Sequence, residues 1–504
     1  MSELTYWQAA RFLDCATFGP QHEDIVALQN SGVDNWLQHQ LMIDANEHFP
    51  HLEAKQLSNS NVWPHHRNAT WFDFALWGED QLRQRVAYAL SQILVVSNVG
   101  DLVVKPDRPL ATYYDLLVRY AFGSYRELLY HVSISPFMGE FLTHAGNKSR
   151  AVTGVDPDQN YAREIMQLFT MGLNQLNMWG EPILDADGNL VPNYTEDDVQ
   201  NLAKLFTGWR RHAPLTHNVN WCKPMYVVEH DHDITEKVIM GHVFPANVDA
   251  ETELLALLDL LVDHPSTAPN ISKFLISKLV TSNPSPEYIY RVSSVFRNTG
   301  GQLDAVVLAI LTDDEVYRQD SRGVRVRESR LHATALLRAL DCFTVRNISG
   351  GGLTEERSFS YLTVLGANSV FNFYDRDFIP PGSLGDQGLL APEFDGVEWL
   401  DMVKISNWVY QQIWDKAEDT RKPNKKHFIY VRLKPFFTVA EKEGEEALLN
   451  LIEMRFCKGQ MTERLRRALK AIFTLHSNDG ASIELTVRQM VYFTSTSSEF
   501  RVQG

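Results

Sequence analysis

The sequence predicts a mainly α-helical protein with a large multi-helix body, long loops and at most a few short strands. Apolar residues recur at helical spacing in many segments, as they do in amphipathic helices that pack on a core. The chain has 504 residues, 44% hydrophobic and 22% charged, which is typical of a globular protein. Because single cores stop growing near roughly 250–300 residues, we expect one inseparable body, residues 1–504, with two packed lobes at about 1–345 and 346–504.

In the first half of the chain, the helix predicted over residues 80–97 shows the pattern most clearly. Leu82, Val86 and Ile93 lie on one of its stripes. Gly172 is suited to end another helix, and Asp198 stands where a capping box needs an acid. The other helices predicted in this half span residues 113–121, 124–135, 160–171 and 195–209.

Two irregular segments are predicted, one between the helices at 160–171 and 195–209 and one after residue 209. The Asp187-Gly188 pair predicts a turn within residues 184–194, and a calcium loop is the weaker alternative there. Residues 210–247 are predicted to be non-helical, with a short strand at 225–229.

The second half returns to helices separated by loops. Ser285 is a predicted cap for a helix that starts at Pro286. The other helices predicted here span residues 251–262, 271–280, 303–311, 327–340, 397–414, 445–457, 461–475 and 481–493. Loops are predicted at residues 350–352, 359–392 and 418–426.

Charge and motif content exclude several classes of protein. The net charge of -16 disfavours binding to nucleic acid, and no apolar run is long enough for a transmembrane helix. The polar N-terminus does not resemble a signal peptide, so the chain as written is expected to be cytoplasmic. Hydrolase, zincin and nucleotide-binding signatures are absent, and the four cysteines form no CxxC pair.

The polar face of the helix predicted over residues 160–171 is the first candidate site. Arg163, Glu164, Gln167 and Thr170 come close together on it. A carboxylate beside a guanidinium can bind a metal, act as a base or orient a substrate. The alternative is an ion pair that holds helices together.

A run of imidazoles and carboxylates, His230-Asp231-His232-Asp233, is the second candidate site. In a continuing strand both imidazoles would project from one face and could hold a divalent metal. The alternative is a polar loop that caps and turns. Lys237 adds a cation for an anionic substrate, and Arg83 with Arg85 is a third candidate that could bind an anion.

Blocks of residues along almost the whole chain resemble a bacterial domain-of-unknown-function family, the one numbered 1800. The central block is Asn160-Tyr161-Ala162-Arg163-Glu164, followed by Leu168-Phe169-Thr170-Met171-Gly172. The other blocks lie at residues 10–20, 80–86, 205–209, 230–241, 369–374, 391–394 and 498–500. The resemblance implies no established activity. It implies frequent export and genes that neighbour those of sulfatase-like exported proteins.

Two functions follow as expectations. One is a metal-assisted, hydrolase-like enzyme of the cell envelope; the alternative is a non-catalytic binding or assembly partner of a sulfatase-like exported protein. The expected catalytic residues are Glu164 and Arg163, the binding residues Asn160, Gln167, Arg83, Lys237 and Trp209, and the ligands of a divalent metal His230, Asp231 and His232.

Three structural expectations accompany these assignments. Residues 160–172 should pack on residues 195–209 near the centre of the protein. Glu164 should be buried and paired with Arg163, Arg83 or Arg85, because an unpaired buried carboxylate is costly. Convergence of Glu164 with the imidazoles of residues 230–233 would favour the enzyme.

Overall fold

The computed structural model describes residues 4–57, 65–98, 107–320, 322–344, 363–395, 399–418 and 429–503, and it confirms the mainly α-helical class. The helices before residue 207 are α1 (Tyr6–Ala16), α2 (His22–Ser31), α3 (Val33–Met42), α4 (His48–Leu57), α5 (His65–Trp77), α6 (Gln81–Leu90), α7 (Asp107–Arg119), α8 (Tyr125–Ser133), α9 (Pro136–Phe141), α10 (Arg150–Thr153), α11 (Asn160–Gln167) and α12 (Glu196–Leu205). The later helices are α13 (Asn218–Trp221), α14 (Ala250–Asp263), α15 (Thr267–Leu279), α16 (Pro286–Thr299), α17 (Leu303–Leu311), α18 (Ser329–Ala339), α19 (Trp399–Trp414), α20 (Lys434–Glu443), α21 (Glu445–Phe456), α22 (Glu463–Asp479), α23 (Ile483–Ser495) and α24 (Ser498–Arg501). None of the described helices is long and apolar enough to cross a membrane.

The described strands are short and pair antiparallel in twos. They are β1 (Trp209–Arg210) with β2 (Tyr226–Val227), β3 (Lys237–Ile239) with β4 (His242–Phe244), and β5 (Arg325–Val326) with β6 (Val502–Gln503). The last pair joins the end of the chain to its middle. Short 3-10 turns are η1 (Glu229–Asp231), η2 (Asp314–Tyr317), η4 (Gly385–Gln387) and η5 (Pro392–Phe394).

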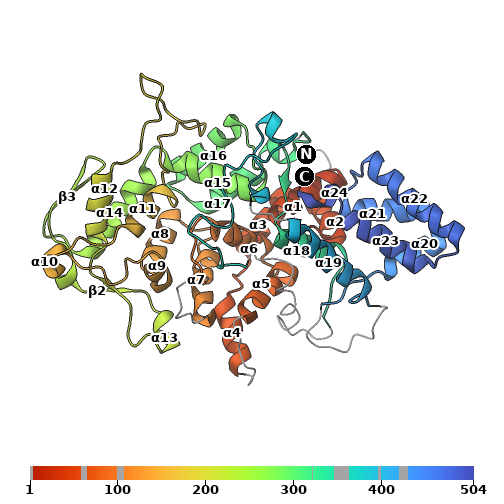
Figure 1. Ribbon diagram of the computed structural model, residues 1–504, viewed down its shortest axis with the longest axis horizontal. Coiled ribbons are helices and arrows are strands. Elements are labelled where there is room, and N and C mark those ends of the chain that lie inside the picture. The colour runs from red at the N-terminus through yellow and green to blue at the C-terminus, as the bar shows by residue number, and fades with distance from the viewer. Residues whose placement is uncertain are drawn as a thin grey trace.

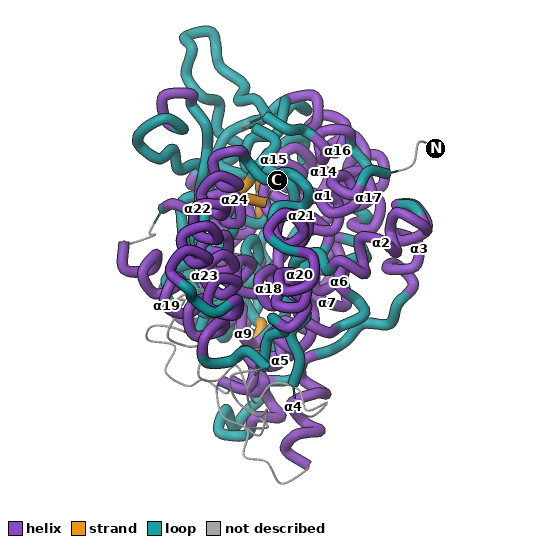
Figure 2. Tube along the Cα trace, turned by 90° about the vertical axis from the view of Figure 1, so that its right-hand side faces the viewer, coloured by secondary structure: helices purple, strands orange, loops and turns teal. Residues whose placement is uncertain are grey.

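The molecule is elongated (Figure 1). Helices α10 to α14 lie at one end, α20 to α23 lie at the other, and α1, α6, α15 and α18 lie between them, with both chain termini nearby. Figure 2, seen from the α20–α23 end, shows helices throughout and strands only as small patches. The buried apolar side chains described in the structure form one cluster that reaches both parts of the chain, and the division into two lobes near residue 345 stays a prediction.

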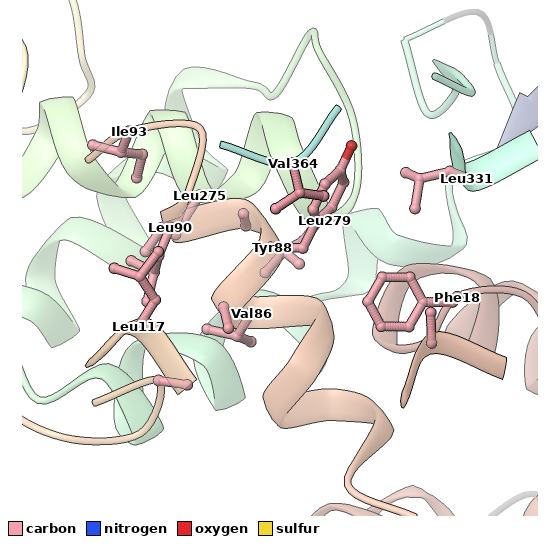
Figure 3. Close-up of a cluster of buried hydrophobic side chains, with 14 of the residues drawn as sticks. Phe18, Val86, Tyr88, Leu90, Ile93, Leu117, Leu275, Leu279, Leu331 and Val364 are labelled. Atoms are coloured by element: carbon pink, nitrogen blue, oxygen red, sulfur yellow. The ribbon is translucent and has the colours of Figure 1, made fainter. Parts of the chain in front are cut away.

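Helix α6 is central to the core. Val86, Tyr88 and Leu90 from this helix are buried among side chains of several other helices (Figure 3). These neighbours are Leu117 of α7, Leu275 and Leu279 of α15, and Leu331 of α18. The buried stripe predicted for this region is therefore confirmed. The packing of this stripe holds α15 against α6. The candidate site described below lies where these two helices meet.

Capping residues begin helices where the sequence predicted them. The Thr195 hydroxyl accepts a hydrogen bond from the Asp198 N–H, while the Asp198 carboxylate accepts one from the Thr195 N–H. Ser124 and Ser285 cap α8 and α16 through the same kind of side-chain contact. The helix predicted at residues 303–311 has the same bounds in the structure.

Three predicted helices are too long, and one of them is α12, which ends at Leu205 rather than at residue 209. Helix α6 ends at Leu90 rather than at residue 97, and the Ser91 hydroxyl donates to the Tyr88 carbonyl at this end. Helix α11 ends at Gln167 rather than at residue 171, where the Thr170 hydroxyl donates to the Ile165 carbonyl over 2.6 Å. In both places side chains bond to carbonyls at the helix end, a competition that apolar spacing does not show.

Other predictions are confirmed only in part. The strand at 225–229 exists but is shorter, and the segment 210–247 contains α13 and two strand pairs. Residues 184–194 turn back on themselves, and the Asp185 carboxylate accepts hydrogen bonds from nearby backbone N–H groups, as in a plain turn. The described part of 359–392 is mostly loop. Residues 350–352 and most of 418–426 lie outside the described residues.

Several helices occur where no pattern predicted one. The early ones are α1 to α5, and the others are α9, α10, α13, α20 and α24. In α1 the buried face includes Arg11 and Asp14, whose charges interrupt the apolar period. Because these side chains find partners elsewhere in the fold, their burial could not be read from spacing.

Candidate functional site

A cavity of about 710 Å³ lies where the ends of α6 and α11 meet α15 and the loop at residues 369–377. Gln92 follows α6, and Gln167 is the last residue of α11. The segment from Leu173 to Leu190 adds a further wall. The pocket is therefore built from segments far apart in the sequence, of a size suited to a small organic molecule.

One stripe of α15 faces this pocket. Asn270, Phe274 and Lys278 follow one another at intervals of four residues and all line the cavity, as does Lys273. The Asn270 amide donates to the Thr170 carbonyl over 2.6 Å and accepts from Arg376 over 3.2 Å. Asn270 thus joins the end of α11 to the loop at 369–377.

Lys278 is the most unusual residue of the pocket because it is a lysine with only 4% of its surface exposed. Its Nζ donates to the Tyr374 hydroxyl over 3.3 Å and lies 4.5 Å and 5.4 Å from the ring centroids of Tyr374 and Phe274. An ammonium has three N–H donors, and this hydrogen bond uses one of them. Burial lowers the pKa of Lys278 to about 8, against the opposing effect of Glu328 and Glu393.

A buried ionic network lies directly behind Lys278. Arg325 donates to Glu328 over 2.5 Å and to Glu393 over 2.7 Å. Arg325 and Arg85 each donate to the Lys278 carbonyl over 2.6 Å. Burial alone would raise the pKa of Glu328, but Arg325 and Lys278 lower it to about 2.

The charges of this network do not balance if Lys278 is protonated. Arg85, Lys278 and Arg325 then bring three positive charges, and Glu328 and Glu393 bring two negative ones. An uncompensated buried charge is costly. A neutral Lys278, or an anion in the pocket, would restore the balance.

Hydrogen bonds connect the pocket wall to this network. The Tyr374 hydroxyl and the Asn372 amide each donate to Gln92 Oε1 over 3.3 Å. The Gln92 amide in turn donates to both oxygens of Glu328, at 3.1 Å and 3.2 Å. The Tyr374 hydroxyl therefore joins Lys278 to Gln92, and Gln92 joins it to the buried ionic network.

Of the residues predicted from the sequence, Gln167 lines this pocket and Arg85 belongs to its network, as described above. Asn160 donates to the Thr143 hydroxyl over 2.9 Å. Arg83 lies 4.5 Å from the ring centroid of Phe122 and donates weakly to backbone carbonyls. These positions do not test the roles assigned to the residues.

The pairing predicted for Glu164 is wrong. Arg163 donates instead to Glu196 over 3.0 Å, because α12 begins beside it, and both Arg83 and Arg85 donate to carbonyls. The predicted burial is confirmed, since Glu164 is 9% exposed. One carboxylate oxygen of Glu164 has no hydrogen-bond partner, and burial raises its pKa against the effect of Arg163.

The predicted contact between α11 and α12 is confirmed, but their position near the centre of the protein is wrong. The rings of Tyr161 and Phe206 meet edge to face with centroids 4.7 Å apart. Both helices lie towards the α10–α14 end of the molecule (Figure 1).

The two imidazoles of residues 230–233 point in different directions. His230 lies on the exposed side of η1, because this stretch turns as a 3-10 helix rather than continuing as a strand. His232 is buried, with Nδ1 3.0 Å from the Thr207 carbonyl oxygen and Nε2 3.3 Å from a Glu253 oxygen. Asp231 pairs with Arg210.

Lys237 and Trp209 are buried close to this segment. The Lys237 ammonium donates to Glu253 over 2.8 Å and to the Asp233 carbonyl over 2.6 Å. Trp209 lies in β1, and its indole N–H has no hydrogen-bond partner. Across the described ranges, no three His, Cys, Asp or Glu side chains come together as a metal site requires.

Sequence reasoning missed Lys278, Tyr374 and Glu328 as members of a site. A usable signal was present in residues 271–280, where Lys278 stands among apolar residues, four positions after Phe274. The block at 369–374 was noted as a motif, but its contact with α15 depends on the tertiary fold.

A protein-family model matches the chain that contains this pocket, its buried lysine and the network behind it. The family model described as "Protein of unknown function (DUF1800)" matches residues 11–502. No curated protein and no solved structure matches the chain.

Proposed function

Because the chain belongs to the DUF1800 family of proteins of unknown function, its role has to be argued from the site, and we propose that the protein binds a small organic acid in the pocket of α15. The observation that carries this proposal is the buried Lys278, which faces a cavity of about 710 Å³ with donors left for a ligand.

The two lysines of the pocket lie at different depths. Lys273 is half-buried and Lys278 is buried, and they are five residues apart on one helix, about 7.5 Å along its axis. An acid group of the ligand is proposed to meet Lys273 near solvent, while a second polar group reaches Lys278 and Tyr374. Arg376 also lines the pocket, where it is paired with Asp377 over 3.5 Å, so the two lysines are the cations proposed to meet the ligand.

Thermal unfolding with matched four-carbon probes tests this proposal. Succinate should raise the melting temperature, because a ligand that binds only the folded state stabilises it, whereas its uncharged diamide and the diamine putrescine should not. Lys273→Gln should weaken the effect of succinate about tenfold or more in concentration, whereas the exposed Lys442→Gln should not. Equal shifts with the diamide, or no shift with succinate, would refute the proposal.

A second proposal keeps the metal-assisted, hydrolase-like activity expected from the sequence. Its proposed residues are Glu164, Arg163, Asn160, Gln167, Arg83, Lys237, Trp209, His230, Asp231 and His232. The buried Glu164 oxygen without a partner supports it, since such an atom is available to a ligand. Elemental analysis of the wild type and of His230→Ala, an exposed position, should show one divalent metal per chain that the variant loses. Metal-free protein or unchanged metal content would count against it.

The alternative role, as a non-catalytic partner of a sulfatase-like exported protein, is also kept as a proposal that the resemblance alone supports. The test is to mix the two purified proteins and to measure the mass of the eluting species by size-exclusion chromatography with light scattering. Separate elution at micromolar concentrations would argue against a stable complex.

A further inference from the structure

We propose that Lys278 is a reactive amine that forms an imine with an aldehyde or ketone group of the ligand. The inference rests on the proposed function in that both use the same pocket. It adds a covalent step and narrows the ligand to an oxo acid, with its acid group at Lys273 and its carbonyl at Lys278.

The surroundings of Lys278 favour the neutral amine, which is the nucleophilic form. Arg85 from α6 and Arg325 from β5 oppose a third positive charge. Glu328 and Glu393 favour that charge, but each of them is already paired with Arg325. With two arginines and two glutamates charged, a neutral Lys278 leaves the network balanced.

Aromatic packing around Lys278 also favours the neutral amine. The rings of Phe274 and Tyr374 lie within 5.4 Å of the Lys278 Nζ, so little water surrounds it. Lys278 lines the cavity, and its Nζ donates to the Tyr374 hydroxyl, which lines the same cavity. A carbonyl carbon held in the cavity can therefore reach the nitrogen lone pair.

The reaction balances with groups that the pocket contains. The Nζ lone pair attacks the carbonyl carbon and forms a C–N bond, and the oxygen takes up a proton. The nitrogen gives up both of its hydrogens, which are the two protons that the oxygen takes up. The second C–N bond forms as the C–O bond breaks, and the oxygen leaves as water. The products are an imine and one water molecule, with no change of oxidation state.

Tyr374 is placed to move the protons of this reaction. Its hydroxyl lies 3.3 Å from Lys278 Nζ and 3.3 Å from Gln92 Oε1. It can donate to the departing oxygen and be reprotonated from the nitrogen, which is general acid–base catalysis within hydrogen-bond reach.

Reductive trapping tests the inference. The protein is incubated with succinic semialdehyde and cyanoborohydride, which reduces an imine to a stable secondary amine, and the modified lysine is located by peptide mass spectrometry. Lys278 should be labelled before the other lysines, Lys273 included, and its labelling rate should increase as the pH rises through about 8. Tyr374→Phe should slow the labelling about a hundredfold at the same site.

Control variants separate chemistry from folding. Lys278→Arg keeps a cation in the pocket and should abolish labelling there, whereas Lys273→Arg should not, and circular dichroism checks that both variants fold. Labelling spread over surface lysines with Lys278 unmodified would overturn the inference.

Succinate, which has no aldehyde, distinguishes the two proposals. If succinate stabilises the protein but the semialdehyde does not label Lys278, the imine is refuted and the binding function stands. If Lys278 is labelled but succinate has no effect, acid recognition is refuted and the reactive amine stands. Failure of both refutes both.

Discussion

At the scale of one residue, Arg325 holds the charged side chains behind the pocket in place. The side chain is fully buried, and its guanidinium reaches Glu328, Glu393 and the Lys278 carbonyl. Buried ion pairs add little net stability when complete, but removing one partner leaves charges unpaired in a low-dielectric interior. Replacing Arg325 would leave two carboxylates without their main partner.

We therefore predict that Arg325→Met lowers the free energy of unfolding by about 3–5 kcal/mol, measured by urea denaturation. Arg150→Met is the matched control, because Arg150 forms a solvent-exposed pair with Asp156 that contributes little. Equal denaturation midpoints for the two variants would contradict the prediction.

The titration of Lys278 gives a second residue-scale prediction. Its pKa is about 8 in the folded chain and 10.5 as a free side chain, so between these values the unfolded state binds more protons. Stability rises with pH wherever that holds. The unfolding free energy of the wild type minus that of Lys278→Met should therefore increase from pH 8 to pH 10, by up to about 1.4 kcal/mol per pH unit. A difference that falls over this range would show that burial does not depress this pKa.

At the scale of an element, one capping residue of helix α12 stabilises both the start of the helix and the neighbouring strand pair. The Asp198 carboxylate accepts from the Thr195 N–H over 2.7 Å and from the Met240 N–H over 2.6 Å. Met240 lies in the turn between β3 and β4, with φ at 50°. The cap thus fixes the start of α12 and holds the strand pair against it.

Thr195→Ala is predicted to lower the free energy of unfolding by about 1 kcal/mol, the usual cost of losing an N-cap. Asp198→Ala should cost more, because it also leaves the Met240 N–H without its acceptor. Chemical denaturation measures both, with the exposed Asp197→Ala as the control in the same turn. The interpretation fails if Asp198→Ala is the milder of the two capping variants.

Asp14 connects distant parts of the chain at the scale of the whole molecule. Its carboxylate pairs with Arg327 over 2.7 Å and with Lys458 over 2.5 Å. The Gln503 amide donates to the Asp14 carbonyl over 2.8 Å. The start, middle and end of the sequence therefore meet at one buried residue.

Asp14→Asn is predicted to lower the free energy of unfolding by about 3–5 kcal/mol, because two buried cations lose their carboxylate. Glu446→Gln is the control, since Glu446 forms exposed pairs with Arg466 and Lys470. Burial alone would raise the pKa of Asp14, but Arg327 and Lys458 hold it below its ordinary value of 3.8. Its stabilisation is therefore present above pH 3.8 and lost as the pH falls further, a loss that the variant should not show.

The sequence predicted some segments of the candidate site, but it did not predict that they come together. Apolar spacing predicted the helix at residues 271–280, and the block at 369–374 stood out as a motif. Nothing in either segment shows that Tyr374 lies against Lys278, because almost a hundred residues separate them and only folding brings them together. The pairing of Glu164 failed for the same reason, since its neighbour Arg163 turned to Glu196 on another helix.

The sequence by itself determined the mainly helical class, most helices of the second half and the caps at Ser124, Thr195 and Ser285. These features depend on interactions within a few residues, so local spacing encodes them. Only the tertiary structure decided which charges are buried and how the pocket is formed. Each of those depends on partners distant in the sequence, and the cost of burying a charge is set by the partners that the fold supplies.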